Sequence, residues 1–336
     1  GEDSGATLDL ADIRNSLRAL MWRQVGVERA GGALAEALET VEGWCRYVLP
    51  RQFAEPQGWQ LQNMLEVARL MMALKLGSLA QGASGIAPAT LAMLEAMLVR
   101  GLVPVVPAQG SVGASGDLAP LAHMAAVMVG EGEAWLGDQR MPAGLALRGA
   151  GLQPLTLEAK EGLALINGTQ FSTAWAALAC ADAERVWEAA MGAAALSTEV
   201  LMGSFGPARE DVQALRPYRG AQEAARRLRE YARRSALVES HRDCDRVQDA
   251  YSLRCVPPVM GASWDAILHV EQQLEVELNS VNDNPLVFAG SAETVSAGLF
   301  HAQPVALAAD YLKIAVAEIG SLSERRIDRL LDSRVS

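Results

Sequence analysis

The segment best equipped for chemistry is a glycine-rich loop at residues 110–123, which reads GSVGASGDLAPLAH. Its glycines allow a tight turn, and a loop of this kind can bind an anion through exposed backbone N–H groups. The loop lacks the GK[ST] ending of a P-loop, and its glycines, three residues apart, do not match a dinucleotide-binding fingerprint. From these residues alone, a tight turn that leads into a helix is the simplest interpretation.

Further along the chain, five side chains could serve a site: Asn167, Gln248, Tyr251, Arg254 and Phe300. Each also has a structural explanation. Asn167 could cap a turn, Gln248 could be solvated, and Tyr251 could lie in the core with a bonded hydroxyl. Arg254 could pair with a surface carboxylate, and Phe300 could simply pack. Taken singly, these residues do not decide between structure and function.

Taken together, the segments resemble the motifs of the histidine and aromatic amino acid ammonia-lyases. The loop matches the signature of that family almost letter for letter. Five other segments follow in the family's order: residues 161–170, 247–255, 282–286, 298–302 and 320–326. One departure is Ala250, where the family usually has a proline. Because alanine lacks the fixed φ of proline, the resemblance does not extend to the stiffness of that turn.

The resemblance implies a prosthetic group made from the chain itself. In the family an Ala-Ser-Gly tripeptide, here Ala114-Ser115-Gly116, cyclises and loses two waters to give 4-methylidene-imidazole-5-one (MIO). A small Ala114 and a Gly116 without a Cβ suit this reaction, because the backbone can bend until the Gly116 nitrogen reaches the Ala114 carbonyl. Asp117 is expected to assist the cyclisation. Neither a metal nor FAD is expected.

The resemblance also implies a reaction and a role for each candidate residue. The MIO would accept the amine of an amino acid, and Arg254 would hold the carboxylate in its guanidinium fork. Tyr251, Asn167 and Gln248 would line the MIO and the developing charge. Phe300 would pack near the prosthetic ring and the substrate side chain. A base would then remove a proton from the β-carbon, and ammonia would leave.

The expected substrate is L-histidine, which would give urocanate. The segments around residues 240–241, 254–255 and 300–302 are closer to the histidine enzymes than to the phenylalanine or tyrosine enzymes. Because family members are tetramers built around long helices, a homotetramer is also expected.

Composition and charge are compatible with a protein that acts on a small molecule. Half of the 336 residues are apolar, and the net charge of −11 argues against a nucleic-acid binder. The longest apolar runs are too short to span a bilayer, and no signal peptide is recognised. The four cysteines share no CxxC spacing that would indicate zinc. A cytoplasmic protein without a membrane partner is expected.

Hydrophobic periodicity predicts a mainly α-helical fold of the long-helix bundle type. One helix is predicted to run without a break through residues 59–76, followed by turn residues at 103–116 and short β-prone pieces at 133–148. Further helices are predicted at residues 156–165, 170–195 and within 213–242. The clearest helix covers 304–332. Its apolar stripe, at spacings of four and three, consists of Ala308, Leu312, Ala315, Ile319 and Leu322.

The first 73 residues resemble a different family, because residues 14–29 and 61–70 are similar to the C-terminal three-helix domain of L-aspartate oxidase. We therefore expect two domains, a three-helix segment at 1–73 and an ammonia-lyase core at 74–336, joined as a chimera or gene fusion. The flavin domain of an aspartate oxidase is absent, which is why no FAD is expected.

The same departure leaves parts of the ammonia-lyase pattern unmatched. The family takes its catalytic base from a tyrosine in an N-terminal glycine-rich loop, and its C-terminal helices supply a glutamate to the site. Neither segment, nor the N-terminal histidine segment, has a match here. Because loss of a general base costs about 10²–10⁴-fold in rate, impaired activity is expected. Two alternatives stay open: a helical scaffold without turnover, and an aspartate-oxidase relative, which the missing dinucleotide motif disfavours.

Overall fold

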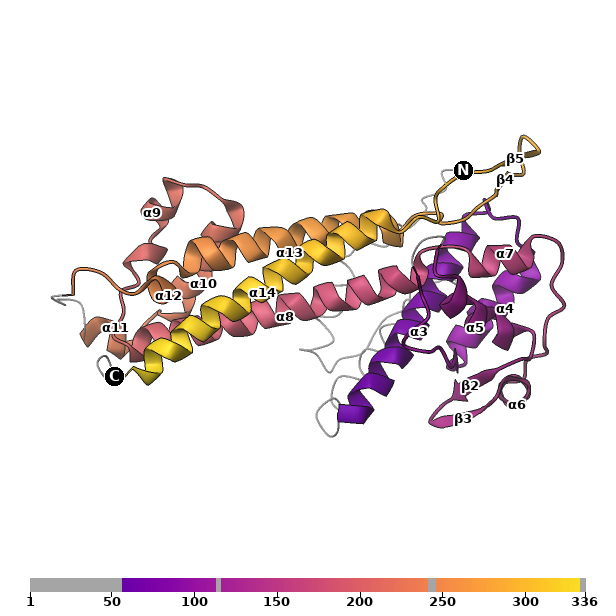
Figure 1. Ribbon diagram of the computed structural model, residues 1–336, viewed down its shortest axis with the longest axis horizontal. Helices are drawn as coiled ribbons and strands as arrows, with labels where there is room; N and C mark the ends of the chain where they lie inside the picture. Colours follow the sequence, from indigo (N-terminus) through magenta and orange to yellow (C-terminus); the bar gives the residue numbers. More distant parts are fainter. Residues whose placement is uncertain (1–55, 113–115, 241–245, 333–336) are drawn as a thin grey trace. The chain divides into compact units, whose positions relative to one another are not determined.

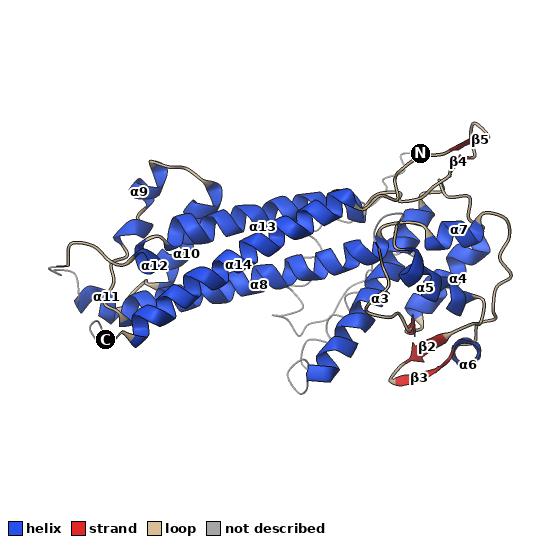
Figure 2. Cartoon of the chain, in the orientation of Figure 1, coloured by secondary structure: helices blue, strands red, loops and turns tan. Residues whose placement is uncertain are grey.

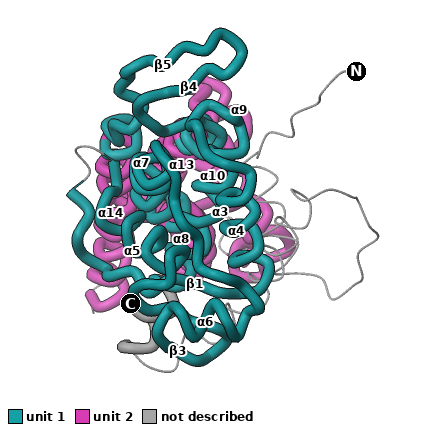
Figure 3. Tube along the Cα trace, turned by 90° about the vertical axis from the view of Figure 1, so that its right-hand side faces the viewer, with its two compact units in different colours: residues 1–178, 274–306 teal, residues 179–273, 307–336 magenta. Residues whose placement is uncertain are grey.

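The computed structural model describes residues 56–112, 116–240 and 246–332, and this part of the chain is mainly α-helical, as predicted (Figures 1 and 2). It divides into two compact units (Figure 3). Unit 1 contains the described parts of residues 1–178 and 274–306, and unit 2 those of residues 179–273 and 307–336. Three long helices contribute residues to both units: α8 (Gln170–Val200), α13 (Val256–Leu278) and α14 (Gln303–Leu331).

Unit 1 combines helices with two small antiparallel sheets. Its other elements are α3 (Pro56–Ala80), α4 (Pro88–Val99), β1 (Leu102–Pro104), α5 (Leu118–Met128), β2 (Glu133–Leu136), β3 (Gln139–Pro142), α6 (Ala143–Gly149), α7 (Glu161–Ile166), β4 (Leu286–Phe288) and β5 (Glu293–Val295). In the sheet of β1, β2 and β3, Trp135 pairs with Val103 and Arg140. Apolar side chains of α3, α4 and α5 are fully buried in the core, among them Met71, Leu94 and Met124.

Unit 2 is held together by contacts among α8, α13 and α14. Trp187 on α8 donates through Nε1 to the carbonyl oxygen of Met260 on α13 at 2.8 Å, and its ring centre lies 4.4 Å from that of Trp264. Ser263 on α13 donates through Oγ to the carbonyl oxygen of Ala315 on α14 at 3.1 Å. The shorter elements of this unit are η2 (Gly206–Ala208), α9 (Glu210–Ala214), α10 (Arg219–Tyr231), α11 (Ala236–Ser240) and α12 (Tyr251–Arg254).

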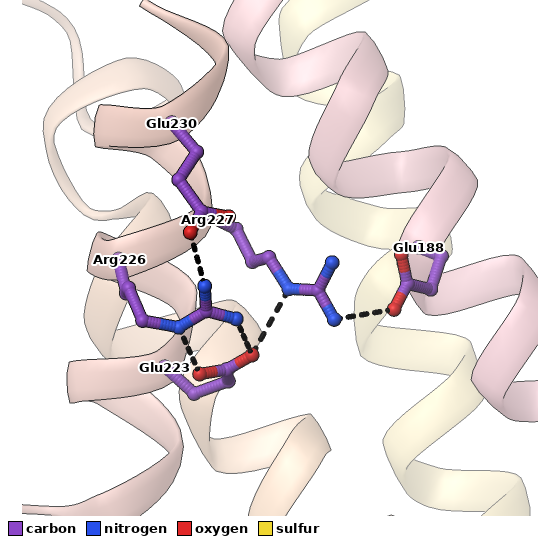
Figure 4. A network of polar contacts seen from close by, with 5 residues as sticks. All are labelled: Glu188, Glu223, Arg226, Arg227 and Glu230. Carbon is purple, nitrogen blue, oxygen red and sulfur yellow. Dashed lines mark hydrogen bonds and ion pairs between the residues drawn. The ribbon is translucent and has the colours of Figure 1, made fainter. Parts of the chain in front are cut away.

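An ionic network joins α10 to α8 within unit 2. Arg227 on α10 donates to Glu223 of the same helix at 2.9 Å and to Glu188 on α8 at 2.8 Å (Figure 4). Glu223 also accepts from Arg226, and these bonds lower the pKa of its carboxyl group to about 2. The side chains of the network are partly exposed, and such pairs contribute modestly to stability.

Most of the predicted elements are confirmed. The helix predicted through residues 59–76 is continuous in α3, strands β2 and β3 lie within 133–148, and the five stripe residues of α14 are all buried. The helix predicted at 156–165 is wrong in its first half, since α7 begins only at Glu161. Lys160, directly before it, has a φ of 76°, in the left-handed region that a right-handed helix cannot include.

The predicted division at residues 73 and 74 falls inside α3, at a point where hydrophobic periodicity predicts a continuous helix. Most of the three-helix segment predicted at 1–73 lies outside the described residues. The two-domain assignment therefore stays a prediction.

Candidate active site

The glycine-rich loop enters α5 through a turn that favours glycine. Gly116 has a φ of 81°. A Cβ at this position would lie 2.7 Å from both the nitrogen and the carbonyl oxygen of Gly168, and 3.2 Å from Asn167 Oδ1. Because a side chain would collide with backbone, glycine allows the turn to lie directly against the peptide of residues 167 and 168. Ala114 and Ser115 lie outside the described residues.

Asp117 is fully buried and fastens this turn to the start of α8. Its carboxylate accepts hydrogen bonds from Ser111 Oγ at 2.6 Å, and from the backbone N–H and Oγ of Ser172, both at 2.7 Å. Its own N–H donates to Gly168 O at 2.6 Å. The first turn of a helix presents free N–H groups and the positive end of its dipole, a location that suits a carboxylate. The position of Asp117 is therefore fixed by several elements at once.

Asn167, predicted to line the prosthetic group, is buried beside the turn. Its side-chain Nδ2 donates to Asn284 O at 3.0 Å, and its own carbonyl oxygen accepts from Lys75 Nζ at 2.6 Å. Gly168 follows with a φ of 147°, and a Cβ there would lie 2.7 Å from Asn282 O. The peptide of residues 167 and 168 thus contacts both the loop and the segment 282–284.

Lys75 is a residue of this cluster that was not predicted from the sequence. Its side chain is fully buried on α3. Burial lowers the pKa of its amine to about 7, with Asp283 acting to raise that pKa and Lys160 to lower it further. The signal that could have found Lys75 is a lysine at an apolar position of a helix, between Leu74 and Leu76.

A buried carboxylate, Asp283, and a half-buried one, Glu277, connect the segment 282–284 to the same cluster. Asp283 accepts from Lys160 Nζ at 2.6 Å and from the N–H of Asn284 at 2.7 Å. Glu277, near the end of α13, accepts from Thr169 Oγ1, and burial raises the pKa of its carboxyl group. Unit 1 therefore contains a buried polar cluster whose members satisfy one another and hold Asn167 in place.

Three other predicted site residues lie in unit 2, on or next to α12. The guanidinium carbon of Arg254 stands 4.6 Å from the centre of the Tyr251 ring, a cation–π contact. Arg254 Nε is buried and has no hydrogen-bond partner among the residues that the structure describes. A buried donor without a partner on a guanidinium can be satisfied by the carboxylate of a ligand. Tyr251 and Gln248 are exposed.

Ala250 keeps the conformation that a proline would impose. Its φ is −60° and its ψ is 153°, while proline fixes φ near −65°. The turn that leads into Tyr251 therefore has a φ at residue 250 that a proline could also adopt.

Phe300 is half-buried in a turn between β5 and α14, in unit 1. Within the described ranges, no group of three or more His, Cys, Asp or Glu side chains could hold a metal ion. In the same part of the chain, no helix combines the length and the apolar character needed to cross a membrane.

The residues of unit 1 fit the predicted cyclisation of the loop. The space beside Gly116 admits no side chain. Because glycine has no Cβ, its backbone nitrogen is free of steric hindrance from one. Asp117 and Asn167 hold the backbone on either side of the contact between loop and peptide. The structure thus brings Gly116, Asp117 and Asn167 together in unit 1.

Residues 55–336 match the family described as aromatic amino acid lyase. The chain is 52% identical over 271 residues to a histidine ammonia-lyase from Gloeobacter violaceus, in an alignment that covers 81% of this chain and 53% of that protein. The chain thus spans about half the length of this curated relative.

Two enzymes are among the solved structures that are similar to the chain. Phenylalanine aminomutase from Pantoea agglomerans has a TM-score of 0.78 at 29% identity, over 99% of this chain and 72% of that one. Histidine ammonia-lyase from Trypanosoma cruzi has a TM-score of 0.74 at 34% identity, over 98% of this chain and 67% of that one. The resemblance of residues 1–73 to L-aspartate oxidase finds no support in these comparisons and stays a prediction.

Proposed function

Because the chain belongs to the aromatic amino acid lyase family, we propose that it is an ammonia-lyase that converts L-histidine to urocanate with an electrophile, MIO, made from Ala114-Ser115-Gly116. The observation that carries this proposal is the close contact of Gly116 with the peptide of residues 167 and 168, with Asp117 fastened beside it. A backbone cyclisation at Gly116 needs such a turn, without space for a side chain. The 52% identity to a histidine ammonia-lyase favours histidine as the substrate.

The electrophile forms by loss of two waters. The Gly116 nitrogen bonds to the Ala114 carbonyl carbon, and the carbonyl oxygen leaves as water with the amide protons of Ser115 and Gly116. The second water takes the Ser115 hydroxyl and its α-hydrogen, which leaves a methylidene group. Asp117 assists by holding the turn through its N–H and its carboxylate, so that the nitrogen and the carbon meet in one geometry.

When formed, the group supplies an acceptor for the amine of the amino acid. Arg254 binds the substrate carboxylate, and its buried Nε is a donor that finds no partner within the described part of the chain. We assign Tyr251, Gln248 and Phe300 to the surroundings of the reacting atoms, together with Asn167. A base takes a proton from the β-carbon, the bond between the α-carbon and nitrogen breaks, and ammonia leaves as the double bond forms.

We also propose that the assembly of this chain is a homotetramer. The tetramer follows from the family resemblance.

Urocanate formation from L-histidine tests this proposal. The purified chain should form urocanate, followed by its ultraviolet absorbance, faster than the Ser115→Ala variant, which has no hydroxyl to lose. If the wild-type loop has lost two waters but the chain forms urocanate no faster than the variant, the turnover of histidine is contradicted. If the wild-type loop is unmodified and urocanate again forms no faster than with the variant, the formation of the electrophile is contradicted as well. That result would support a helical scaffold without turnover.

A further inference from the structure

Lys75 brings an amine into the interior of unit 1, at the peptide that contacts the loop. The side chain is fully buried, and Nζ donates to Asn167 O at 2.6 Å. The charged groups near it are Asp283 and Lys160, which pair with each other at 2.6 Å. The hydrogen bond of Lys75 is therefore made to a backbone carbonyl, and Asp283 is already engaged by another lysine.

The carbonyl that Lys75 contacts belongs to the same amide as the nitrogen that lies against Gly116. Asn167 O and Gly168 N are part of one planar peptide unit. Gly168 N lies 2.7 Å from the position that a Cβ of Gly116 would take. In its protonated form, Lys75 withdraws electron density from the amide nitrogen through the carbonyl oxygen and makes the N–H a stronger donor, and this effect is larger in a low-dielectric interior.

Packing alone does not explain a lysine at this position. Removing an ammonium from water is costly, and an apolar side chain of similar size would fill the same space without that cost. We propose that Lys75 is a positioning residue for the cyclisation of the loop, whose amine fixes and polarises the peptide of residues 167 and 168 against Gly116. This inference rests on the proposed function, because it concerns the step that makes the electrophile.

Three substitutions separate the hydrogen bond from the charge. Lys75→Gln keeps a donor for the Asn167 carbonyl without the cation, Lys75→Arg keeps the cation, and Lys75→Met removes both. Lys313→Met, at an exposed lysine of α14, is the matched control. After cell-free synthesis, the mass of the peptide that contains Ala114-Ser115-Gly116 is followed over time. Near-ultraviolet circular dichroism and thermal unfolding are recorded for each protein.

We expect Lys75→Gln and Lys75→Met to fold, but to lose the two waters about tenfold and about a hundredfold more slowly than wild type. Lys75→Arg should cyclise faster than Lys75→Gln, and Lys313→Met should match wild type. Cyclisation of Lys75→Gln at the wild-type rate would overturn the inference. The inference would also be overturned if, in all three variants, the decrease in cyclisation were no larger than the decrease in the amount of folded protein.

An unmodified loop in the wild-type chain is a different result. It would contradict the proposed function and, with it, the inference about Lys75. If instead the wild-type loop is cyclised and Lys75→Gln cyclises at the wild-type rate, only the inference is contradicted.

Discussion

Lys75 makes the stability of the chain depend on pH in a definite direction. Burial lowers its pKa from 10.5 to about 7, so between these values the unfolded chain binds a proton that the folded chain has released. The free energy of unfolding therefore rises with pH across this window, by at most about 1.4 kcal/mol per pH unit. Below about pH 7 both states hold the proton, and Lys75 adds no slope.

Urea unfolding of wild type and Lys75→Gln at several values between about pH 7 and pH 9 measures this slope. The stability of wild type should increase relative to that of the variant as the pH rises, because the variant has no amine to titrate. Lys313→Met should run parallel to wild type. Parallel curves for wild type and Lys75→Gln would show that Lys75 keeps its ordinary pKa in the folded chain.

The sequence identifies the loop residues of the cluster and misses the lysine, for a physical reason. The types of Gly116 and Asp117 reflect local requirements, a left-handed φ and an acceptor at the end of a turn. The function of Lys75 depends on Asn167, which is 92 residues away in the chain. A helical pattern predicts that such a residue is buried, but it does not identify the residue to which it hydrogen-bonds.

At the scale of the elements, α10 and α13 cross where Gly261 faces the first turn of α10. A Cβ on Gly261 would lie 2.3 Å from Ala221 N and 2.4 Å from Ala221 Cα, so α10 would have to move away. Gly261→Ala should therefore lower the free energy of unfolding by about 1–3 kcal/mol, although alanine favours helix. Urea unfolding measures the change.

The control is Gly192→Ala in the middle of α8, where the nearest atom to an added Cβ is 4.0 Å away. This substitution should raise the free energy of unfolding by about 0.5–1 kcal/mol. Stabilisation by both alanines would contradict the tight crossing of α10 and α13.

Hydrophobic periodicity predicts helix α14 correctly and misses helix α13. The stripe of α14 is predicted correctly because the spacing of its apolar residues is regular and all five are buried. Helix α13 was not predicted; it begins at Val256 and has Pro257 and Pro258 as its next two residues. These prolines resemble a break in the sequence, yet they lie in the first turn, where a missing N–H leaves no hydrogen bond unmade.

For the whole molecule, the order of the motifs along the chain does not reveal their distribution between the units. Gly116, Asp117 and Asn167 belong to unit 1, while Tyr251 and Arg254 belong to unit 2. The motifs indicate which residues are candidates for the site. Which of these residues belong to the same unit depends on long-range packing, which no local sequence pattern encodes. Helix α8 is continuous from Ser172, which binds Asp117, into the core of unit 2.

The mass of the peptide that contains Ala114-Ser115-Gly116, taken from the purified chain, tests the central claim most directly. We predict a mass lower than that of the encoded peptide by two waters. The Ser115→Ala variant should not show this loss, and neither should Gly116→Ala, whose Cβ would collide with Gly168. The full encoded mass in the wild-type chain would contradict the claim that this loop makes an electrophile.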